Sequence, residues 1–294
     1  MEKHNFNGGG VEGGFRARES SANERHVLEI AHRKAEETFR HEIDMESFAA
    51  PVGNYAPAMV TRDMEVVAEL KQRFTLQEAE NPAIGDVKRI SDIFEAMLAD
   101  QIKNNNWFGG NTELIASSEY DDYVNHIDGV LHFKVPGSSD YIALGADVTF
   151  SRASIQEKIG HIKKRIVDGR LSRVKYFELP DKSFKGELNE VPYIVLGAGA
   201  HSVLQMAEQW TDETGGKYLS KHWMQAQLID MAIMQCDEFS RFASARGNAS
   251  ASEKYGYMKE KLARIKNMRQ KLNGQLPEDR DSMFRTMQEV LGTE

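Results

Sequence analysis

The chain has 294 residues, of which 40% are hydrophobic, and this is enough to bury one substantial core or one core with a small accessory domain. The composition excludes a fully disordered or collagen-like protein. The formal net charge of -8 argues against a surface that is uniformly positive. The single cysteine, Cys236, excludes an internal disulfide and a zinc site built from several cysteines.

The apolar stretches are too short for a membrane helix, which needs about 20 apolar residues. The longest of them, residues 193–204, is interrupted by Gly197, Gly199 and His201. The N-terminal residues lack the apolar segment of a signal peptide. We therefore expect a cytoplasmic protein that does not enter a membrane.

Charge is unevenly distributed along the chain. Residues 152–175 and residues 254–271 each carry a net charge of +6, so the remainder carries -20. Such segregation favours a polyanionic partner. Two basic helix faces that are simply solvated would give the same pattern, and both interpretations stay open.

The chain divides into four predicted regions. Residues 1–19 are Gly-rich and lack periodicity, which predicts a disordered tail. Residues 20–84 read as an N-terminal helical extension, residues 85–198 as an α/β core and residues 199–294 as a C-terminal helical region. The helices outside the core are expected at residues 20–46, 62–80, 199–212, 219–245, 254–273 and 278–291.

The core begins with an amphipathic helix from Gly85 to about Asn105, followed by three strands without an intervening helix. A capping box formed by Ser154 and Glu157 begins a second helix, which ends at Gly169. This second helix has an apolar stripe of Ile155, Ile159, Ile162 and Ile166. The strands are expected at residues 112–117, 125–135, 140–150, 173–179 and 191–196, with a charged loop between the last two.

The second and third predicted strands each carry an acid, Asp128 and Asp147, on the less apolar face. A hairpin turning through residues 136–139 and centred on residue 138 would place Asp128 opposite about residue 148. Two neighbouring carboxylates repel, and a divalent cation with oxygen ligands, Mg²⁺ or Mn²⁺, relieves that repulsion. The sequence therefore predicts a metal site at these two strands.

Three more carboxylates, Glu119, Asp121 and Asp122, directly precede the Asp128 strand. Asp122 is a candidate for a further metal ligand. The alternative is that these acids organise a polar loop through hydrogen bonds from their side chains to the backbone.

This arrangement resembles the PD-(D/E)xK superfamily of restriction-endonuclease-like nucleases. The shared features are an acid at one strand, an acid on the next strand and a glutamate on the preceding helix. The resemblance covers about a third of the chain. It implies a restriction-endonuclease-like αβββαβ core, with N- and C-terminal helical extensions around it in this chain. It also implies that Asp128 is the first metal-binding acid, Asp147 the second and Glu95 the helix glutamate.

The chain departs from the family pattern at Thr149, which stands where the family has a lysine. Some family members supply this lysine from the following helix, where Lys158 and Lys163 border the isoleucine stripe on opposite sides. Lys158 is nearer the strand that carries Asp147, so we expect it to take the catalytic role.

These features favour a metal-dependent nuclease that hydrolyses phosphodiester bonds in DNA or RNA. Two alternatives stay open. One is a catalytically inactive nuclease-fold protein that binds nucleic acid or a protein partner, which Thr149 favours. The other is a homo-oligomer assembled through the C-terminal helices. The residues expected to contact nucleic acid are Lys163, Lys164, Arg165, Arg170 and Arg173.

Overall fold

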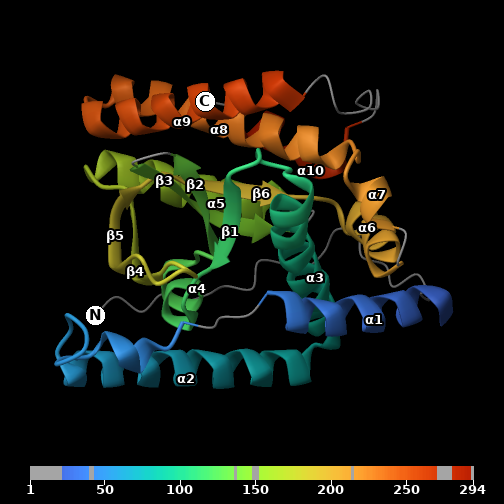
Figure 1. Ribbon diagram of the computed structural model, residues 1–294, viewed down its shortest axis with the longest axis horizontal. Coiled ribbons are helices and arrows are strands. Elements are labelled where there is room, and N and C mark those ends of the chain that lie inside the picture. Colours follow the sequence, from blue (N-terminus) through green and yellow to red (C-terminus); the bar gives the residue numbers. More distant parts are fainter. Residues whose placement is uncertain are drawn as a thin grey trace.

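The computed structural model describes residues 22–39, 43–135, 138–147, 152–212, 215–269 and 280–292, and it shows a mixed α/β protein with helices on both sides of a small sheet (Figure 1). The expected disordered tail, residues 1–19, and Thr149 lie outside this part of the chain. The helices of the N-terminal part are α1 (Ala22–Thr38), the 3-10 helix η1 (Met45–Phe48), α2 (Pro57–Glu80) and α3 (Pro82–Asn105).

The central elements and the C-terminal helices follow the predicted order with three additions, α4, β5 and α7. The central elements are β1 (Thr112–Ala116), α4 (Glu119–Asn125), β2 (Gly129–Val135), β3 (Ser138–Asp147), α5 (Arg152–Val167), β4 (Ser172–Glu178), β5 (Lys185–Val191) and β6 (Tyr193–Gly197). The C-terminal helices are α6 (Ala200–Thr211), α7 (Gly215–Leu219), α8 (Met224–Ala245), α9 (Ala249–Arg269) and α10 (Ser282–Gly292).

The main sheet has the strand order β1-β2-β3-β6. Neighbouring strands are antiparallel from β1 to β3, whereas β6 lies parallel to β3 and is reached through the crossover helix α5. Strand β4, expected to follow α5 into this sheet, instead pairs with β5 in a separate two-stranded sheet. The prediction of a charged loop at β5 was wrong because only Leu188 and Val191 are buried there, too few to give a strand pattern.

The hairpin of β2 and β3 is tighter than predicted. Val135 pairs with Ser138 and Gly129 pairs with Leu144. One step further along this ladder, Asp128 falls opposite Gly145 and not opposite residue 148. The hairpin centre lies between residues 136 and 137, and moving it by about one and a half residues moves the partner of Asp128 by three. Asp147 is then two positions beyond the partner of Asp128 and pairs with Gly197 of β6.

The predicted polar loop before β2 is a helix. Ser118 is its N-cap and accepts a hydrogen bond from the backbone N–H of Asp121, which satisfies one of the first free N–H groups. The helix ends at His126, in the left-handed conformation with a φ of 57°. Because α4 takes up residues 119–125, β2 begins at Gly129 and Asp128 precedes the strand.

Helix α5 has the predicted apolar face, since Ile155, Ile159, Ile162 and Ile166 are all buried. Its start differs from the prediction: α5 begins at Arg152, so Ser154 lies inside the helix and is not its N-cap. Lys158 is consequently in the second turn of the helix and not in the first.

The C-terminal helices close the free edge of β6. Helix α8 lies between the sheet and α9 (Figure 1). The Gln235 side chain accepts a hydrogen bond from the N–H of Val195 at 2.9 Å and donates one to its C=O at 2.7 Å. The Tyr255 hydroxyl bonds in the same way to Tyr193, at 3.1 Å in both directions. The side chains of Gln235 and Tyr255 thus take the place of a neighbouring strand at this edge. Without them, backbone N–H and C=O groups of β6 would lack hydrogen-bond partners.

Candidate functional site

The structure gathers most of the predicted catalytic residues between α3, α4 and α5. Glu95 comes from α3, Asp122 from α4, Asp128 from the segment before β2 and Lys158 from α5, and all four side chains are half-buried. A hydrogen bond joins the carboxyl groups of Asp122 and Asp128. For Asp147 the structure describes the position in β3 but not the side chain.

The charges of these residues act on one another strongly. Burial raises the pKa of Glu95 well above its ordinary value, and the carboxyl groups of Asp128 and Asp122 raise it further, while Lys158 lowers it. Burial also raises the pKa of Asp122 to about 6, although the hydrogen bond with Asp128 acts in the opposite direction and lowers it. The carboxyl groups are therefore close enough to share protons near neutral pH.

A fourth acid, Asp92, belongs to the same group and was missed in the sequence analysis. Its charge raises the pKa values of both Glu95 and Asp122. Burial raises the pKa of Asp92, whereas Lys88 and His32 lower it. The spacing of Lys88, Asp92 and Glu95 along α3 puts them on one flank of the helix, and this spacing was the available signal. We call Asp92, Glu95, Asp122 and Asp128 the acidic centre.

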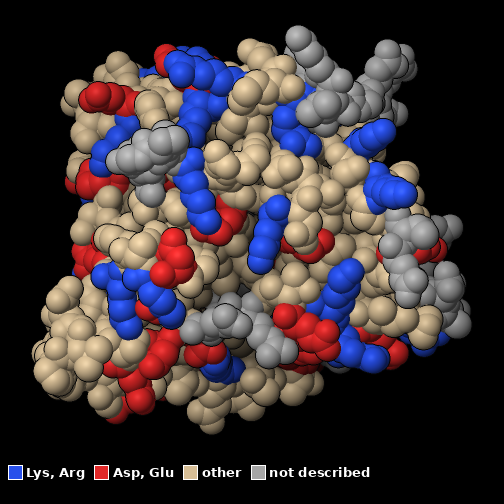
Figure 2. Space-filling model, viewed as in Figure 1, with Lys and Arg blue, Asp and Glu red and all other residues tan. Residues whose placement is uncertain are grey.

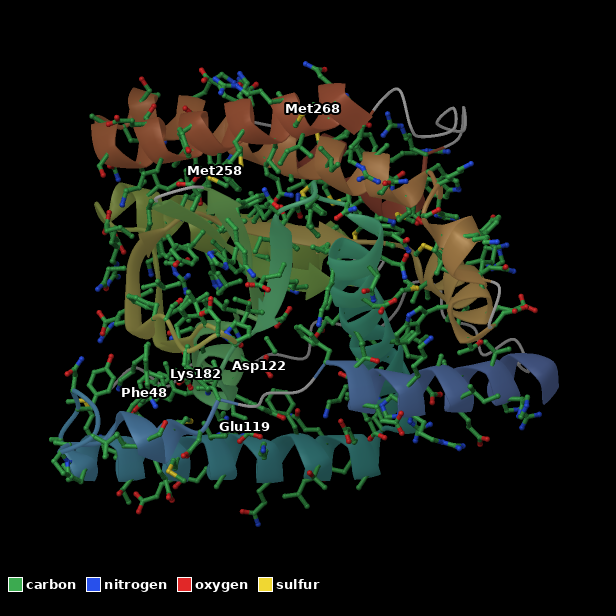
Figure 3. All side chains as sticks on the ribbon, viewed as in Figure 1. Phe48, Glu119, Asp122, Lys182, Met258 and Met268 are labelled. Carbon is green, nitrogen blue, oxygen red and sulfur yellow. The ribbon has the colours of Figure 1, made fainter. Side chains whose placement is uncertain are left out.

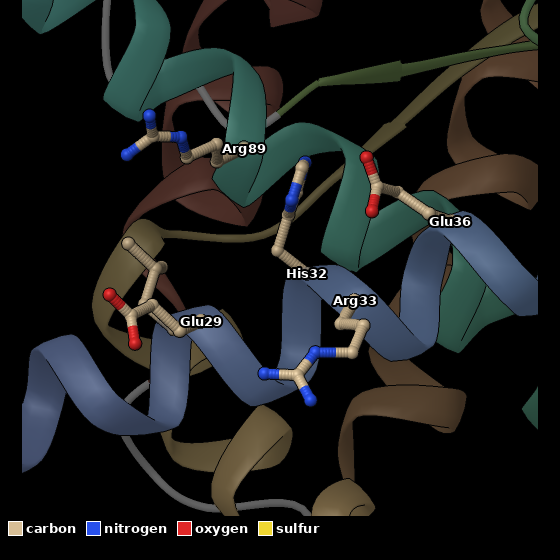
Figure 4. A pocket seen from close by; sticks show the side chains of 6 residues that line it. Glu29, His32, Arg33, Glu36 and Arg89 are labelled. Carbon is tan, nitrogen blue, oxygen red and sulfur yellow. The ribbon is translucent and has the colours of Figure 1, made fainter.

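The acidic centre is bordered by an open cleft of about 420 Å³ between α1 and α3 (Figure 4). His32 points from α1 towards α3, with its Nε2 atom 3.4 Å from an Oδ atom of Asp92. The other lining residues are Leu28, Glu29, Arg33, Glu36 and Arg89. Charges of both signs line this cleft, so it does not select for an anion or a cation.

Asp121, next to Asp122 in the sequence, has a structural role. Its buried carboxylate accepts hydrogen bonds from the backbone N–H groups of Lys175 and Tyr176 on β4, at 2.8 and 2.9 Å. It also accepts hydrogen bonds from Ser118 and Asn125, both at 2.7 Å. Burial raises the pKa of Asp121, and these hydrogen bonds lower it. Asp121 therefore fixes α4 on β4 and, with it, the position of Asp122.

Glu119, the third acid of this run, has its own partner outside the acidic centre. It forms an ion pair with Lys71 of α2, and Figure 3 shows it on the side of α4 nearer to α2. Its charge also raises the pKa of Asp122, three residues further along the helix. The three acids that the sequence places together thus have three different partners.

The basic residues expected to contact nucleic acid do not form one surface. Lys163 is buried, with its Nζ atom 3.6 Å from Glu238 of α8 and 5.1 Å from the Phe242 ring, so the structure leaves it no access to a phosphate. Arg165 is half-buried and donates a hydrogen bond to Ser172 at 2.7 Å. Lys164, Arg170 and Arg173 are exposed. Arg170 forms an ion pair with Asp168, and Arg173 forms one with Glu187.

The second basic segment, in α9, forms four ion pairs with acids from other elements and one with Glu260 of the same helix. Figure 2 accordingly shows side chains of both signs interspersed over the visible face. Segregation of charge along the sequence does not become segregation in space here. The pairs are Lys254 with Glu190, Lys259 with Asp237, Lys261 with Asp140, Arg264 with Glu260 and Lys266 with Asp230.

Comparison with protein-family models, with curated proteins and with solved structures finds no match for this chain. Within the described ranges, no helix has the length and apolar character needed to cross a membrane. Among the same residues, no group of three or more histidine, cysteine, aspartate or glutamate side chains has an arrangement that holds a metal ion. The acidic centre is therefore defined by its charges and hydrogen bonds.

The two neighbouring aspartates should respond oppositely to the same substitution. Asp121→Asn places an N–H₂ group against two backbone N–H donors and should lower the free energy of unfolding by about 2–3 kcal/mol. Asp122→Asn removes a charge that is partly desolvated and faces other acids, and should raise it by about 1–3 kcal/mol at pH 7. Urea unfolding of both variants measures the two changes.

The pH dependence gives an internal check. The pKa of Asp122 rises from 3.8 to about 6 on folding, so the folded state binds more protons between these values. The free energy of unfolding should therefore fall as the pH rises through this range, and Asp122→Asn should reduce that fall. Equal pH slopes in wild type and variant, or stabilisation by Asp121→Asn, would contradict these assignments.

Proposed function

We propose that the chain is a metal-dependent nuclease that hydrolyses phosphodiester bonds, with the acidic centre as its catalytic site. The observation that carries this proposal is the convergence of Glu95, Asp122, Asp128 and Lys158, which come from three helices and the start of a strand. The sequence resemblance implied roles in a nuclease site for Glu95, Asp128 and Lys158, and the run of acids before the Asp128 strand made Asp122 a candidate metal ligand. A buried group of acids is unfavourable for folding, which favours a functional reason for its presence.

The order of elements supports a restriction-endonuclease-like αβββαβ core. Helix α3, the three antiparallel strands β1–β3 and the crossover helix α5 give the first five elements. In this proposal β6, parallel to β3, is the last strand, and the hairpin of β4 and β5 is an insertion before it. Asp128 then precedes β2 and Asp147 ends β3, next to each other along the ladder.

The residues of the acidic centre suit Mg²⁺ or Mn²⁺ in their chemistry. Carboxylate oxygens are the ligands that both ions accept. Burial and the charges of Asp128 and Asp122 raise the pKa of Glu95, and a bound cation would oppose this by compensating those charges. Asp128, Asp147 and Asp122 would hold the ion, with Glu95 beside them. Such an ion lowers the pKa of a bound water and stabilises charge on the phosphate.

The protein's own groups contribute position and charge. Lys158 acts on Glu95 from the second turn of α5, so its ammonium group lies on the side of the helix that faces the acids. There it would offset charge that develops on the phosphate oxygens, the role that Thr149 is unable to fill. Lys163 occupies the other border of the isoleucine stripe and pairs with Glu238.

Metal binding and cleavage test the proposal together. Mn²⁺ should raise the melting temperature of the wild type, because a ligand that binds only the folded state stabilises it. Wild type should also cleave plasmid, linear duplex or single-stranded substrates with Mg²⁺ or Mn²⁺. Asp128→Asn and Asp147→Asn should lose both properties.

Glu119→Gln is the matched control, since Glu119 lies on the same helix as Asp122 but pairs with Lys71. It should keep the Mn²⁺ shift and the cleavage. An equal Mn²⁺ shift in all three variants would remove the metal site. A metal shift without cleavage of any substrate would favour the catalytically inactive relative.

The two lysines of α5 should separate activity from stability. Lys158→Ala should abolish metal-dependent cleavage while the chain stays folded, because the side chain is only half-buried. Lys163→Ala removes one of two cations that pair with Glu238, the other being Arg241 at 2.7 Å, and should lower the free energy of unfolding by about 1–3 kcal/mol. Cleavage per folded molecule and urea unfolding measure the two effects. Full cleavage by Lys158→Ala would show that this lysine is not catalytic.

A further inference from the structure

Helix α5 carries a row of basic side chains on the flank that faces the acidic centre. Lys158, His161 and Arg165 are three and four residues apart, a spacing that places them on one side of a helix. The buried isoleucine stripe borders this flank on one side. Lys164 lies outside the row, on the exposed face of the helix. We call Lys158, His161 and Arg165 the basic row.

Hydrogen bonds fix the orientation of Arg165, at one end of the basic row. The Arg165 guanidinium donates to Ser172 at 2.7 Å and to the backbone carbonyl of Asn125 at 3.5 Å. Asn125 is the last residue of α4, so the row faces the turn that leads from α4 into Asp128. One end of the row therefore lies beside the acidic centre, where Lys158 acts on Glu95.

His126 lies in this turn, across from the basic row. Its backbone is held on both sides: its N–H donates to the carbonyl of Asp122 at 3.1 Å, and its own carbonyl accepts from the Tyr193 hydroxyl at 2.8 Å. Partial burial lowers the pKa of His126, and all three members of the basic row lower it further. The nearby acid is Glu157, which raises it. Four side chains of potential positive charge thus face one another, with one carboxylate close by.

We propose that the basic row binds the phosphate backbone of the substrate strand beside the acidic centre. This inference rests on the proposed nuclease function. At about 1.5 Å per residue the row is about 10 Å long, so it is long enough to contact neighbouring phosphates of one strand. Strand binding would keep these cations together, since each phosphate neutralises charge that they otherwise direct at one another.

The row differs from the surface expected from sequence alone. Lys163 is buried, and Arg170 and Arg173 are paired with acids. His161, which is exposed and central in the row, is the residue whose substitution distinguishes the two surfaces most sharply. Lys164 is the matched control, because it is exposed on the same helix, three residues from His161, but is not among the charges that act on His126.

The test measures binding of a short fluorescein-labelled single-stranded oligonucleotide to the full chain by fluorescence anisotropy, in EDTA and over a range of salt concentrations. His161→Glu should weaken binding about tenfold and flatten the salt dependence, because it places a negative charge among the phosphate contacts. His161→Arg should strengthen binding by about threefold. Lys164→Glu should change it by less than about twofold, although it alters the charge by more than His161→Glu does.

The basic row would be overturned if oligonucleotide binding followed the total charge of the protein, so that Lys164→Glu bound more weakly than His161→Glu. Wild type that cleaves while both His161 variants bind normally would overturn the row and leave the nuclease proposal standing. Binding that depends on His161 in a wild type that cleaves nothing would support the row and remove the hydrolytic activity. A wild type that binds no nucleic acid at low salt would overturn both.

Discussion

Repulsion among the carboxyl groups of the acidic centre is the constraint around which this part of the fold is organised. Four acids from α3, α4 and the segment before β2 are half-buried, burial raises the pKa values of Asp92, Glu95 and Asp122, and the other three acids raise that of Glu95 further. Such a group weakens the folded state unless the elements that carry it are held by other interactions. Lys88 and Lys158 compensate part of the charge from opposite sides.

The hairpin of β4 and β5 supplies the main support. Its backbone N–H groups bind Asp121 and thereby hold α4, the helix that carries Asp122. The same strand is tied to α2 by the ion pair between Lys175 and Asp63 and by a hydrogen bond from the Tyr176 hydroxyl to Asp63 at 2.6 Å. The hairpin of β4 and β5 therefore has a structural role, because it holds in place the helix that carries Asp122.

The sequence predicted those features that depend on local periodicity. The isoleucine stripe of α5, the strands β1, β2 and β3 and the helices at both ends each leave a pattern within about ten to twenty residues. Glu95, Asp128 and Lys158 were selected by the order of these elements, and the structure brings them together. Helix α4 was missed because its seven residues are mostly polar, so they resemble a loop. The partner of β4 was missed because strand pairing depends on distant residues.

Charge was the least reliable guide. The basic stretch in α9 looked like a surface for a polyanion, yet Lys259 and Lys266 pair with Asp237 and Asp230, more than twenty residues away in α8. Lys163 and Lys164 are neighbours in sequence, but one is buried and the other exposed. The sign of a side chain's charge can be read from the sequence, but its ion-pair partner is set by packing between elements. That partner decides whether the charge is available for binding.

The most direct test of the account is the position of a metal ion in crystals of the full chain soaked in Mn²⁺, measured by anomalous diffraction near the manganese absorption edge. The account predicts a peak bounded by the carboxyl groups of Glu95, Asp122 and Asp128, with Asp147 completing the ligands. Asp128→Asn crystals should lose it under the same conditions. A map without a peak at this place at saturating Mn²⁺, or a peak at other residues, would contradict the assignment of the acidic centre as a catalytic metal site.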